Sequence, residues 1–147
     1  MIPIQLSGAL VGGEGKGALF TQIPWVKEAF AKILGFEPFP GTVNVWVGGD
    51  PRSDRALRDI HEAEGVPLLP PEGSNFCPSR CFRARLPSAI PAGLVIPEVD
   101  DYSKNTLELL APLNVREALG ISDGDRIEVE IELESKLDTE DFRVRRS

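Results

Sequence analysis

Residues 126–133 read Arg-Ile-Glu-Val-Glu-Ile-Glu-Leu, a stretch in which apolar and charged side chains alternate strictly. Successive side chains of an extended strand point to opposite faces, so this pattern predicts a strand with one buried and one solvent-exposed face. The four residues before it, Ser122-Asp123-Gly124-Asp125, have the composition of a tight turn. The strand is therefore expected to begin directly after this turn.

Four stretches upstream show the same two-residue period. They are residues 2–11, 42–47, 80–87 and 93–96. Several short strands with few helices predict a mainly β fold, and the strands are not regularly interleaved with helices as in a doubly wound parallel sheet. Residues 65–79 are rich in proline and glycine and are expected to form a loop.

Helical periodicity is confined to short segments. The clearest helix should begin at Pro24, which suits the first helical position, and end at Gly35, a typical terminator. A short charged helix is expected over 53–64 and a helical turn over 104–110. Asn114 and Glu117 have the spacing of a capping box for a short helix that ends at Gly120.

Composition limits the possible functions. The 147 residues are 41% hydrophobic and 27% charged, which is typical of one soluble globular domain. No apolar run is long enough to span a bilayer and no signal peptide is evident, so a cytoplasmic protein is expected. The net charge of −7 disfavours a nucleic-acid partner. We expect a domain over residues 1–134 and a charged C-terminal tail over 135–147.

Cysteine and histidine are too few for most metal or nucleophilic sites. Cys77 and Cys81 are the two cysteines, and His61 is the one histidine. A zinc site with four ligands would need carboxylates or a second subunit. Two reduced thiols and a solvated histidine are the simpler interpretation.

Three features could carry chemistry. The glycine-rich segment 12–17 could direct its amides at a phosphate, although it is not a P-loop and could equally be a plain connection. Thr42 and Asn44 project from one face of a predicted strand and could bind a hard cation, or could simply form a polar face. Glu108 lies among leucines and could be a general base in a cleft, or the exposed side of an amphipathic turn.

Taken together and in this order, these segments resemble the archaeal CTP-dependent riboflavin kinases. The resemblance is carried by Gly13-Glu14-Gly15-Lys16-Gly17, by Lys32-Ile33-Leu34-Gly35-Phe36-Glu37-Pro38 with Gly41-Thr42-Val43-Asn44, by Gly93-Leu94-Val95-Ile96-Pro97, by Leu107-Glu108-Leu109-Leu110-Ala111-Pro112-Leu113-Asn114-Val115-Arg116-Glu117, and by Asp123-Gly124-Asp125. It extends over about residues 8–133 and is thin over 48–92. The resemblance implies a six-stranded cradle-loop β-barrel with a few short helices. It also implies transfer of the γ-phosphoryl group of CTP to the 5′-hydroxyl of riboflavin, which gives FMN and CDP.

The resemblance also implies roles for individual residues. The nucleotide phosphates and the rest of CTP or CDP would contact Gly13, Glu14, Gly15, Lys16, Gly17, Ala18, Leu113, Asn114, Val115 and Arg116. Thr42 and Asn44 would bind Mg²⁺, and Glu108 would lie beside the ribityl chain and accept the hydroxyl proton. Asp100 would contact riboflavin or FMN at a position where the family usually has threonine, and it brings a negative charge there.

Two other functions fit the same residues. One is a barrel that binds a flavin or a nucleotide without turnover and acts as a regulatory module. The other is a CTP-dependent kinase for a different acceptor alcohol, which the charge of Asp100 would favour. An assay with CTP, Mg²⁺ and riboflavin separates these alternatives.

Overall fold

A computed structural model of the chain describes residues 2–12, 21–74, 77–98 and 104–133. Its described part is mainly β, with seven strands, three α-helices and one 3₁₀ turn over Pro87–Ala89. The strands are β1 (Ile2–Val11), β2 (Val43–Trp46), β3 (Val66–Leu68), β4 (Ser79–Leu86), β5 (Ile90–Pro97), β6 (Thr106–Leu110) and β7 (Arg126–Leu133). The helices are α2 (Pro24–Leu34), α3 (Pro51–Glu62) and α4 (Val115–Leu119).

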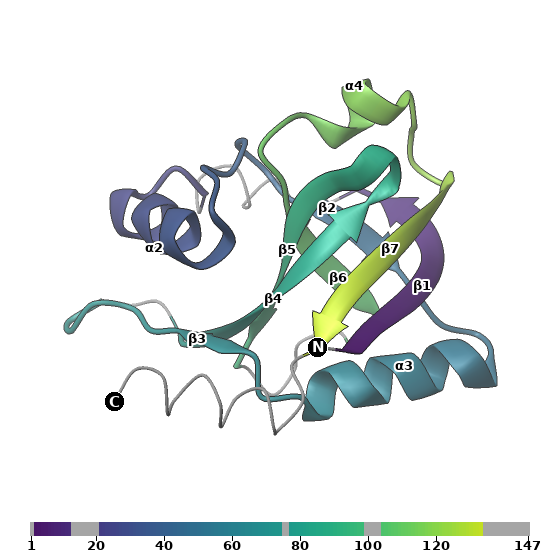
Figure 1. The fold of residues 1–147 in the computed structure, drawn as a ribbon, viewed down its shortest axis with the longest axis horizontal. Coiled ribbons are helices and arrows are strands. Elements are labelled where there is room, and N and C mark those ends of the chain that lie inside the picture. The colour runs from purple at the N-terminus through teal and green to yellow at the C-terminus, as the bar shows by residue number, and fades with distance from the viewer. Residues whose placement is uncertain (1, 13–20, 75–76, 99–103, 134–147) are drawn as a thin grey trace.

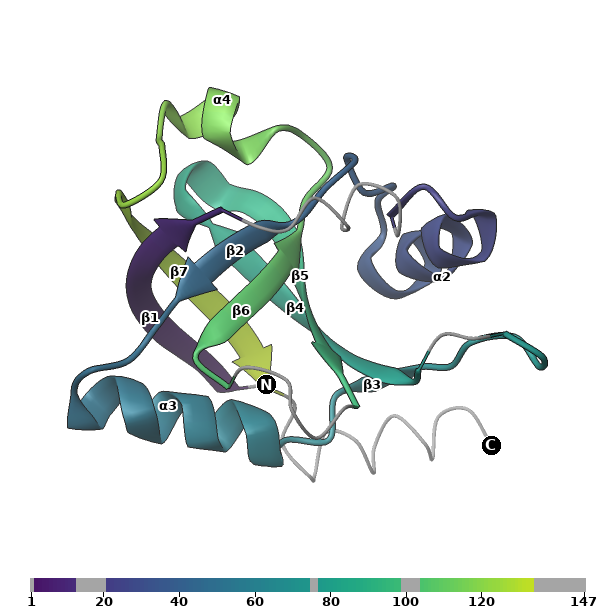
Figure 2. The ribbon, with the colours of Figure 1, turned by 180° about the vertical axis from the view of Figure 1, so that it is seen from behind.

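Six of the strands close into an antiparallel barrel (Figures 1 and 2). Around the barrel the order is β1, β2, β6, β5, β4 and β7, and β7 pairs again with β1. The short strand β3 pairs with the first residues of β4, beyond the place where β7 joins the same edge. The predicted six-stranded barrel is therefore confirmed, with one additional strand attached to it.

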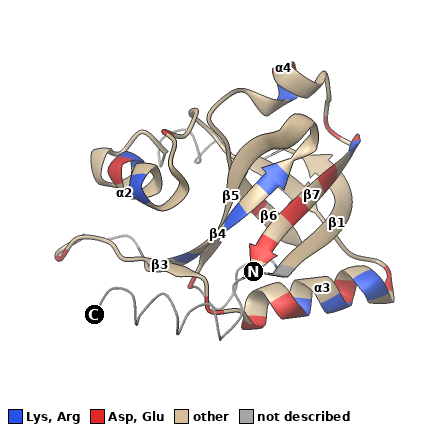
Figure 3. Cartoon of the chain, viewed as in Figure 1, with Lys and Arg blue, Asp and Glu red and all other residues tan. Residues whose placement is uncertain are grey.

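The barrel interior is filled by the apolar side of each alternating strand. Ile127, Val129 and Ile131 of β7 are at most 3% exposed and pack with Val45 and with the rest of the main core. Burying an aliphatic side chain of this size stabilises the fold by about 1.5–3 kcal/mol. The charged residues between them lie on the outer face, and Figure 3 shows the acidic residues of β7 next to basic residues of β4.

Helix α2 covers part of the outer surface of the barrel. Its buried residues Val26 and Phe30 form a second apolar cluster with Leu68, Cys81, Val95 and Leu110 from the strands. Gly93 of β5 lies directly under the side chain of Leu34, where a Cβ atom would collide with Leu34 Cδ1. The helix ends at Gly35, which adopts the left-handed conformation with φ of 82°.

Helix α3 closes one end of the barrel (Figure 2). Its buried residues Leu57 and Ile60 belong to the main core. Asp50 caps the helix, because its Oδ1 accepts a hydrogen bond of 2.8 Å from Ser53 N. At the other end of the helix, Arg80 of β4 donates from Nη1 to the carbonyl oxygens of His61 and Ala63.

The strands β1 and β7, the helix from Pro24 and the capped helix after Asn114 match the sequence predictions closely. The helical turn predicted over 104–110 is wrong, because β6 pairs there with β2 on one edge and with β5 on the other. Leu110 is buried under α2 while Leu107 and Leu109 fill the barrel, and this burial on both faces hides the strand period. The loop predicted over 65–79 contains β3. Within the described ranges, no helix is long and apolar enough to cross a membrane.

Candidate functional site

Asn44 of β2 and Glu108 of β6 lie directly opposite each other on neighbouring strands. Directly paired residues share a face of the sheet, and their Cβ atoms are about 4.5–5.5 Å apart. The alternate residues Val45, Leu107 and Leu109 fill the barrel, so Asn44 and Glu108 lie on its outer surface. Asn44 is nevertheless only 7% exposed, and Glu108 is half-buried. The pairing brings a predicted metal ligand next to the predicted base.

Thr42 completes this group of polar side chains. Its hydroxyl donates to Asn44 Oδ1, with the two oxygens 3.4 Å apart. Adjacent ligands around an octahedral Mg²⁺ are about 2.9 Å apart when the metal–oxygen bonds are 2.0–2.1 Å. The two oxygens therefore need only a small shift to fit one cation. The described residues contain no group of three or more His, Cys, Asp or Glu side chains that could hold a metal.

A cavity of about 210 Å³ opens beside Thr42, where β2 begins and where β6 ends and leads to α4. The lining residues are Phe39, Pro40, Gly41, Thr42, Val43, Ala111, Leu113, Asn114, Val115 and Arg116. The two walls are joined by a hydrogen bond of 2.7 Å from Phe39 N to Ala111 O. The cavity thus brings together Thr42 and all four residues of the predicted nucleotide segment 113–116.

Each of these four residues offers a different group to a ligand. Leu113 is 38% exposed, whereas Val115 is 2% exposed and its side chain belongs to the main core. Asn114 Oδ1 accepts a hydrogen bond of 3.2 Å from Glu117 N, so this oxygen caps α4. Among the residues that the structure describes, Arg116 is the one charged residue that lines the cavity. Contacts from Val115 would therefore come from its backbone, and contacts from Leu113 and Arg116 can come from their side chains.

Arg116 also connects the cavity to the beginning of the predicted phosphate loop. Its Nη2 donates to Asp123 Oδ1 at 2.5 Å and to Val11 O at 3.5 Å. Val11 is the last residue of β1, directly before the glycine-rich segment. An exposed ion pair of this kind contributes only about 0–1 kcal/mol to stability, so Arg116 can rearrange toward a ligand at little cost.

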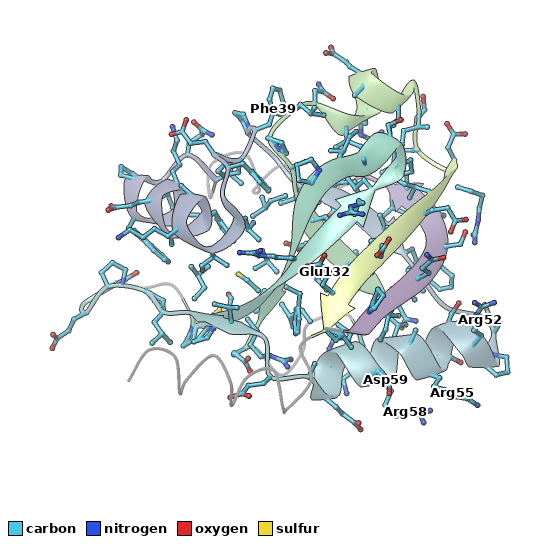
Figure 4. The ribbon with its side chains drawn as sticks, in the orientation of Figure 1. Phe39, Arg52, Arg55, Arg58, Asp59 and Glu132 are labelled. Carbon is cyan, nitrogen blue, oxygen red and sulfur yellow. The ribbon has the colours of Figure 1, made fainter. Side chains whose placement is uncertain are left out.

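The cavity wall that Phe39 forms was not predicted from the sequence. Phe39 is 43% exposed and lies in the connection between α2 and β2, close to the segment that leads to α4 (Figure 4). Gly41 in the same wall has φ of 111°, a conformation that favours glycine, and its N–H donates to the buried Thr21 at 3.1 Å. The prolines on both sides of Phe39 could have signalled a rigid turn that presents an aromatic ring.

Two of the predicted contacts lie outside the described residues. They are the glycine-rich loop Gly13 to Ala18 and Asp100. The residues that the structure does bring together are Thr42, Asn44, Glu108 and the segment from Leu113 to Arg116. Asn44 and Glu108 come from the neighbouring strands β2 and β6, and Thr42 directly precedes β2. Residues 113–116 include the end of the connection after β6 and the first two residues of α4.

Residues 10–131 match a family model named CTP-dep_RFKase, whose description reads "Domain of unknown function DUF120". The chain belongs to this family. The match contains both strands of the candidate site and all of the residues that line the cavity.

Several curated archaeal proteins that carry the name riboflavin kinase are similar to this member of the family. One from Pyrobaculum islandicum is 37% identical over 138 residues, which are 91% of this chain and 63% of that protein. One from Methanoregula boonei is 34% identical over 128 residues, or 86% of this chain and 56% of that protein. One from Sulfolobus acidocaldarius is 33% identical over 131 residues, or 88% of this chain and 82% of that protein. The chain thus spans less than two thirds of the length of the first two.

Proposed function

We propose that this protein transfers the γ-phosphoryl group of CTP to the 5′-hydroxyl of riboflavin and releases FMN and CDP. The observation that carries the proposal is the pairing of Asn44 with Glu108, next to Thr42 and the cavity. The similarity to archaeal proteins named riboflavin kinase supports riboflavin as the acceptor. The name of the matched family supports CTP as the donor.

In this proposal the nucleotide occupies the cavity. The exposed side chains of Phe39 and Leu113 offer apolar contacts to the base and ribose, and Arg116 offers a positive charge to the phosphates. The predicted phosphate loop, Gly13 to Ala18, follows shortly after Val11, whose carbonyl oxygen accepts from Arg116. Backbone amides of such a loop can neutralise phosphate charge even in a protein with a net charge of −7.

Thr42 and Asn44 would hold Mg²⁺ through their oxygens. Magnesium held by these oxygens would supply positive charge that offsets the negative charge developing during phosphoryl transfer. Asn44 is well suited to this role because its burial and its contact with Thr42 restrict its rotamers. Most of the remaining ligands would be waters and the phosphates, as is usual for this cation.

Glu108 would act as the general base. It accepts the proton of the riboflavin 5′-hydroxyl as that oxygen forms a bond to the γ-phosphorus. The bond between the γ-phosphorus and the oxygen that bridges to the β-phosphate breaks, and CDP leaves. Phosphoryl transfer depends on positioning and charge neutralisation more than on covalent participation. No histidine or cysteine is needed for these steps.

The test is a direct assay of the purified chain with riboflavin, Mg²⁺ and each of the four common nucleoside triphosphates, with FMN measured by chromatography. We expect FMN formation with CTP and much slower formation with ATP. Equal or faster turnover with ATP would contradict the assignment of the donor. Binding of riboflavin without any turnover would indicate a regulatory barrel instead, and phosphorylation of another alcohol only would contradict the assignment of the acceptor.

A further inference from the structure

Trp46 is a large aromatic residue to which the proposed reaction assigns no role. It is the last residue of β2, and it is 44% exposed although its neighbours Val45 and Val47 are fully buried. Residues two apart on a strand point to the same side. Trp46 therefore shares the outer face of the barrel with Asn44 and Thr42, and it is paired across to Thr106, two residues before Glu108.

The three parts of this face follow one another along β2. The nucleotide cavity lies at Thr42, the Asn44–Glu108 pair comes next, and Trp46 is at the opposite end. Residues 42 and 46 are about 13 Å apart along an extended strand. A donor bound in the cavity would direct its terminal phosphate at Glu108, and an acceptor would then approach from the side of Trp46.

We propose that Trp46 binds the isoalloxazine ring of the acceptor by stacking, and so selects a flavin. This inference rests on the proposed function. Trp46 and Glu108 are diagonal neighbours, whose Cα atoms are about 7–8 Å apart. The five-carbon ribityl chain, with bonds of about 1.5 Å, spans on the order of 6 Å. A ring on Trp46 thus leaves the 5′-hydroxyl within reach of Glu108.

The local structure keeps the indole in place. A Cβ atom on Gly48 would lie 3.4 Å from Trp46 Cη2 and 3.6 Å from Cζ2, so the backbone of Gly48 lies next to the edge of the indole ring. The Gly48 backbone is fixed in turn, because Asn105 Nδ2 donates to Val47 O at 2.9 Å. An aromatic ring held at one edge, with much of its surface exposed, is a suitable platform for a planar ligand.

Fluorescence can test the stacking without any turnover. Trp25 and Trp46 are the two tryptophans of the chain, so Trp25→Phe leaves Trp46 as the single indole reporter. Titration of this variant with riboflavin should quench the emission in a saturable way. The same titration of free tryptophan with riboflavin gives the correction for absorption by the flavin. Emission that does not change beyond this correction would contradict the inference.

Kinetics give an independent measurement. Trp46→Ala should raise KM for riboflavin by about 5- to 150-fold, the range that stacking of a planar base on an aromatic residue contributes. The values of kcat and of KM for CTP should change by less than about threefold, because Trp46 does not contact the reacting atoms. Trp46→Phe should restore most of the affinity. Leu69→Ala is the matched control, since Leu69 is 69% exposed but lies in the connection after β3.

The possible outcomes separate this inference from the proposed function. If the wild type makes FMN and Trp46→Ala has an unchanged KM for riboflavin, the stacking is wrong and the kinase stands. If riboflavin quenches Trp46 but is never phosphorylated, the stacking stands and the kinase is wrong. Circular dichroism of Trp46→Ala shows whether the fold is retained. If it is not, Trp46→Phe and the quenching experiment decide.

Discussion

Glu108 carries the proton transfer in the proposed reaction, and its surroundings suit that role. It lies on the outer face of the barrel, half-buried, opposite the buried amide of Asn44. Glu108 is paired with β2 on one side and with β5 on the other. These two pairings fix the backbone position from which the carboxylate extends. A base held in this way needs little reorganisation when the acceptor hydroxyl arrives.

Glu108→Gln should therefore reduce kcat for FMN formation by about 10²–10⁴-fold, the usual contribution of general-base catalysis. The amide keeps the shape and polarity of the side chain, so riboflavin binding should change little. Glu128→Gln is the matched control, because Glu128 is an exposed strand glutamate on β7, opposite Ser7. A loss of less than about threefold for Glu108→Gln would mean that Glu108 only positions the flavin or lies outside the site.

Thr42 and Asn44 are best tested together, because each supplies one oxygen to the proposed Mg²⁺ site. The double variant Thr42→Val with Asn44→Leu removes both oxygens and preserves the approximate side-chain volumes, so Mg²⁺-dependent turnover should be lost while the barrel remains folded. Measurement of FMN formation against Mg²⁺ concentration, with circular dichroism as the control for folding, checks this. Unchanged activity, or a double variant that does not fold, would indicate that both residues have a purely structural role.

Among the elements, α2 depends on close contact with the barrel. Its Leu34 side chain lies directly over Gly93 of β5, which has no Cβ atom to obstruct it. Gly93→Ala should therefore destabilise the protein by about 1–3 kcal/mol, the usual cost of overpacking a well-filled site. Denaturant unfolding measures the loss.

A second substitution on α2 is the control for this prediction. Leu34→Ala removes the atoms that the new methyl group would meet, so the double variant should lose less stability than the sum of the two single variants. Strict additivity would show that Gly93→Ala acts through the strand backbone and not through α2.

The predictability of each element follows from how many of its faces are buried. The strand β7 could be predicted because one face meets solvent, so Ile127 and Val129 alternate with glutamates. The strand β6 could not, because α2 covers Leu110 on the outside while Leu107 and Leu109 fill the inside. The strand β3 has only three residues, one of them a proline, and it exists through its pairing with β4.

The candidate site was predictable in part for the same reason. Thr42 and Asn44 follow a clear two-residue period, so their shared face could be predicted. Glu108 could be picked out as a carboxylate among leucines, and the resemblance to a family placed it beside the ribityl chain. Only the register of β2 and β6 shows that it lies opposite Asn44. Phe39 lies between two secondary-structure elements, where no period exists. Its place in the cavity depends on its long-range hydrogen bond to Ala111.

At the scale of the whole molecule, the buried thiol of Cys81 makes the free energy of unfolding depend on pH in the alkaline range. Burial raises the pKa of this thiol from 9.0 to about 12. The folded protein therefore keeps a proton that the unfolded chain releases in this range, and the free energy of unfolding should fall as pH rises from about 9 to 12. Urea unfolding at several pH values measures the slope.

Cys81→Ala should remove this contribution, so the wild type and the variant should differ in slope only above about pH 9. Cys77 is exposed and serves as the internal reference. A thiol reagent at neutral pH should label one cysteine in the native protein and two after unfolding. Rapid native labelling of both would contradict the burial of Cys81.

The pairing of β1 with β7 has a consequence for how the protein is made. These strands share eight residue pairs, from Ile2–Leu133 to Ala9–Arg126, and almost all of the described chain lies between them. A ribosome adds about 5–20 residues per second, so one edge of β1 waits for several seconds before its partner emerges. A free strand edge can capture other chains during that time. Pro3 lies in this strand and has no N–H to offer such a partner, which protects the nascent barrel while it waits.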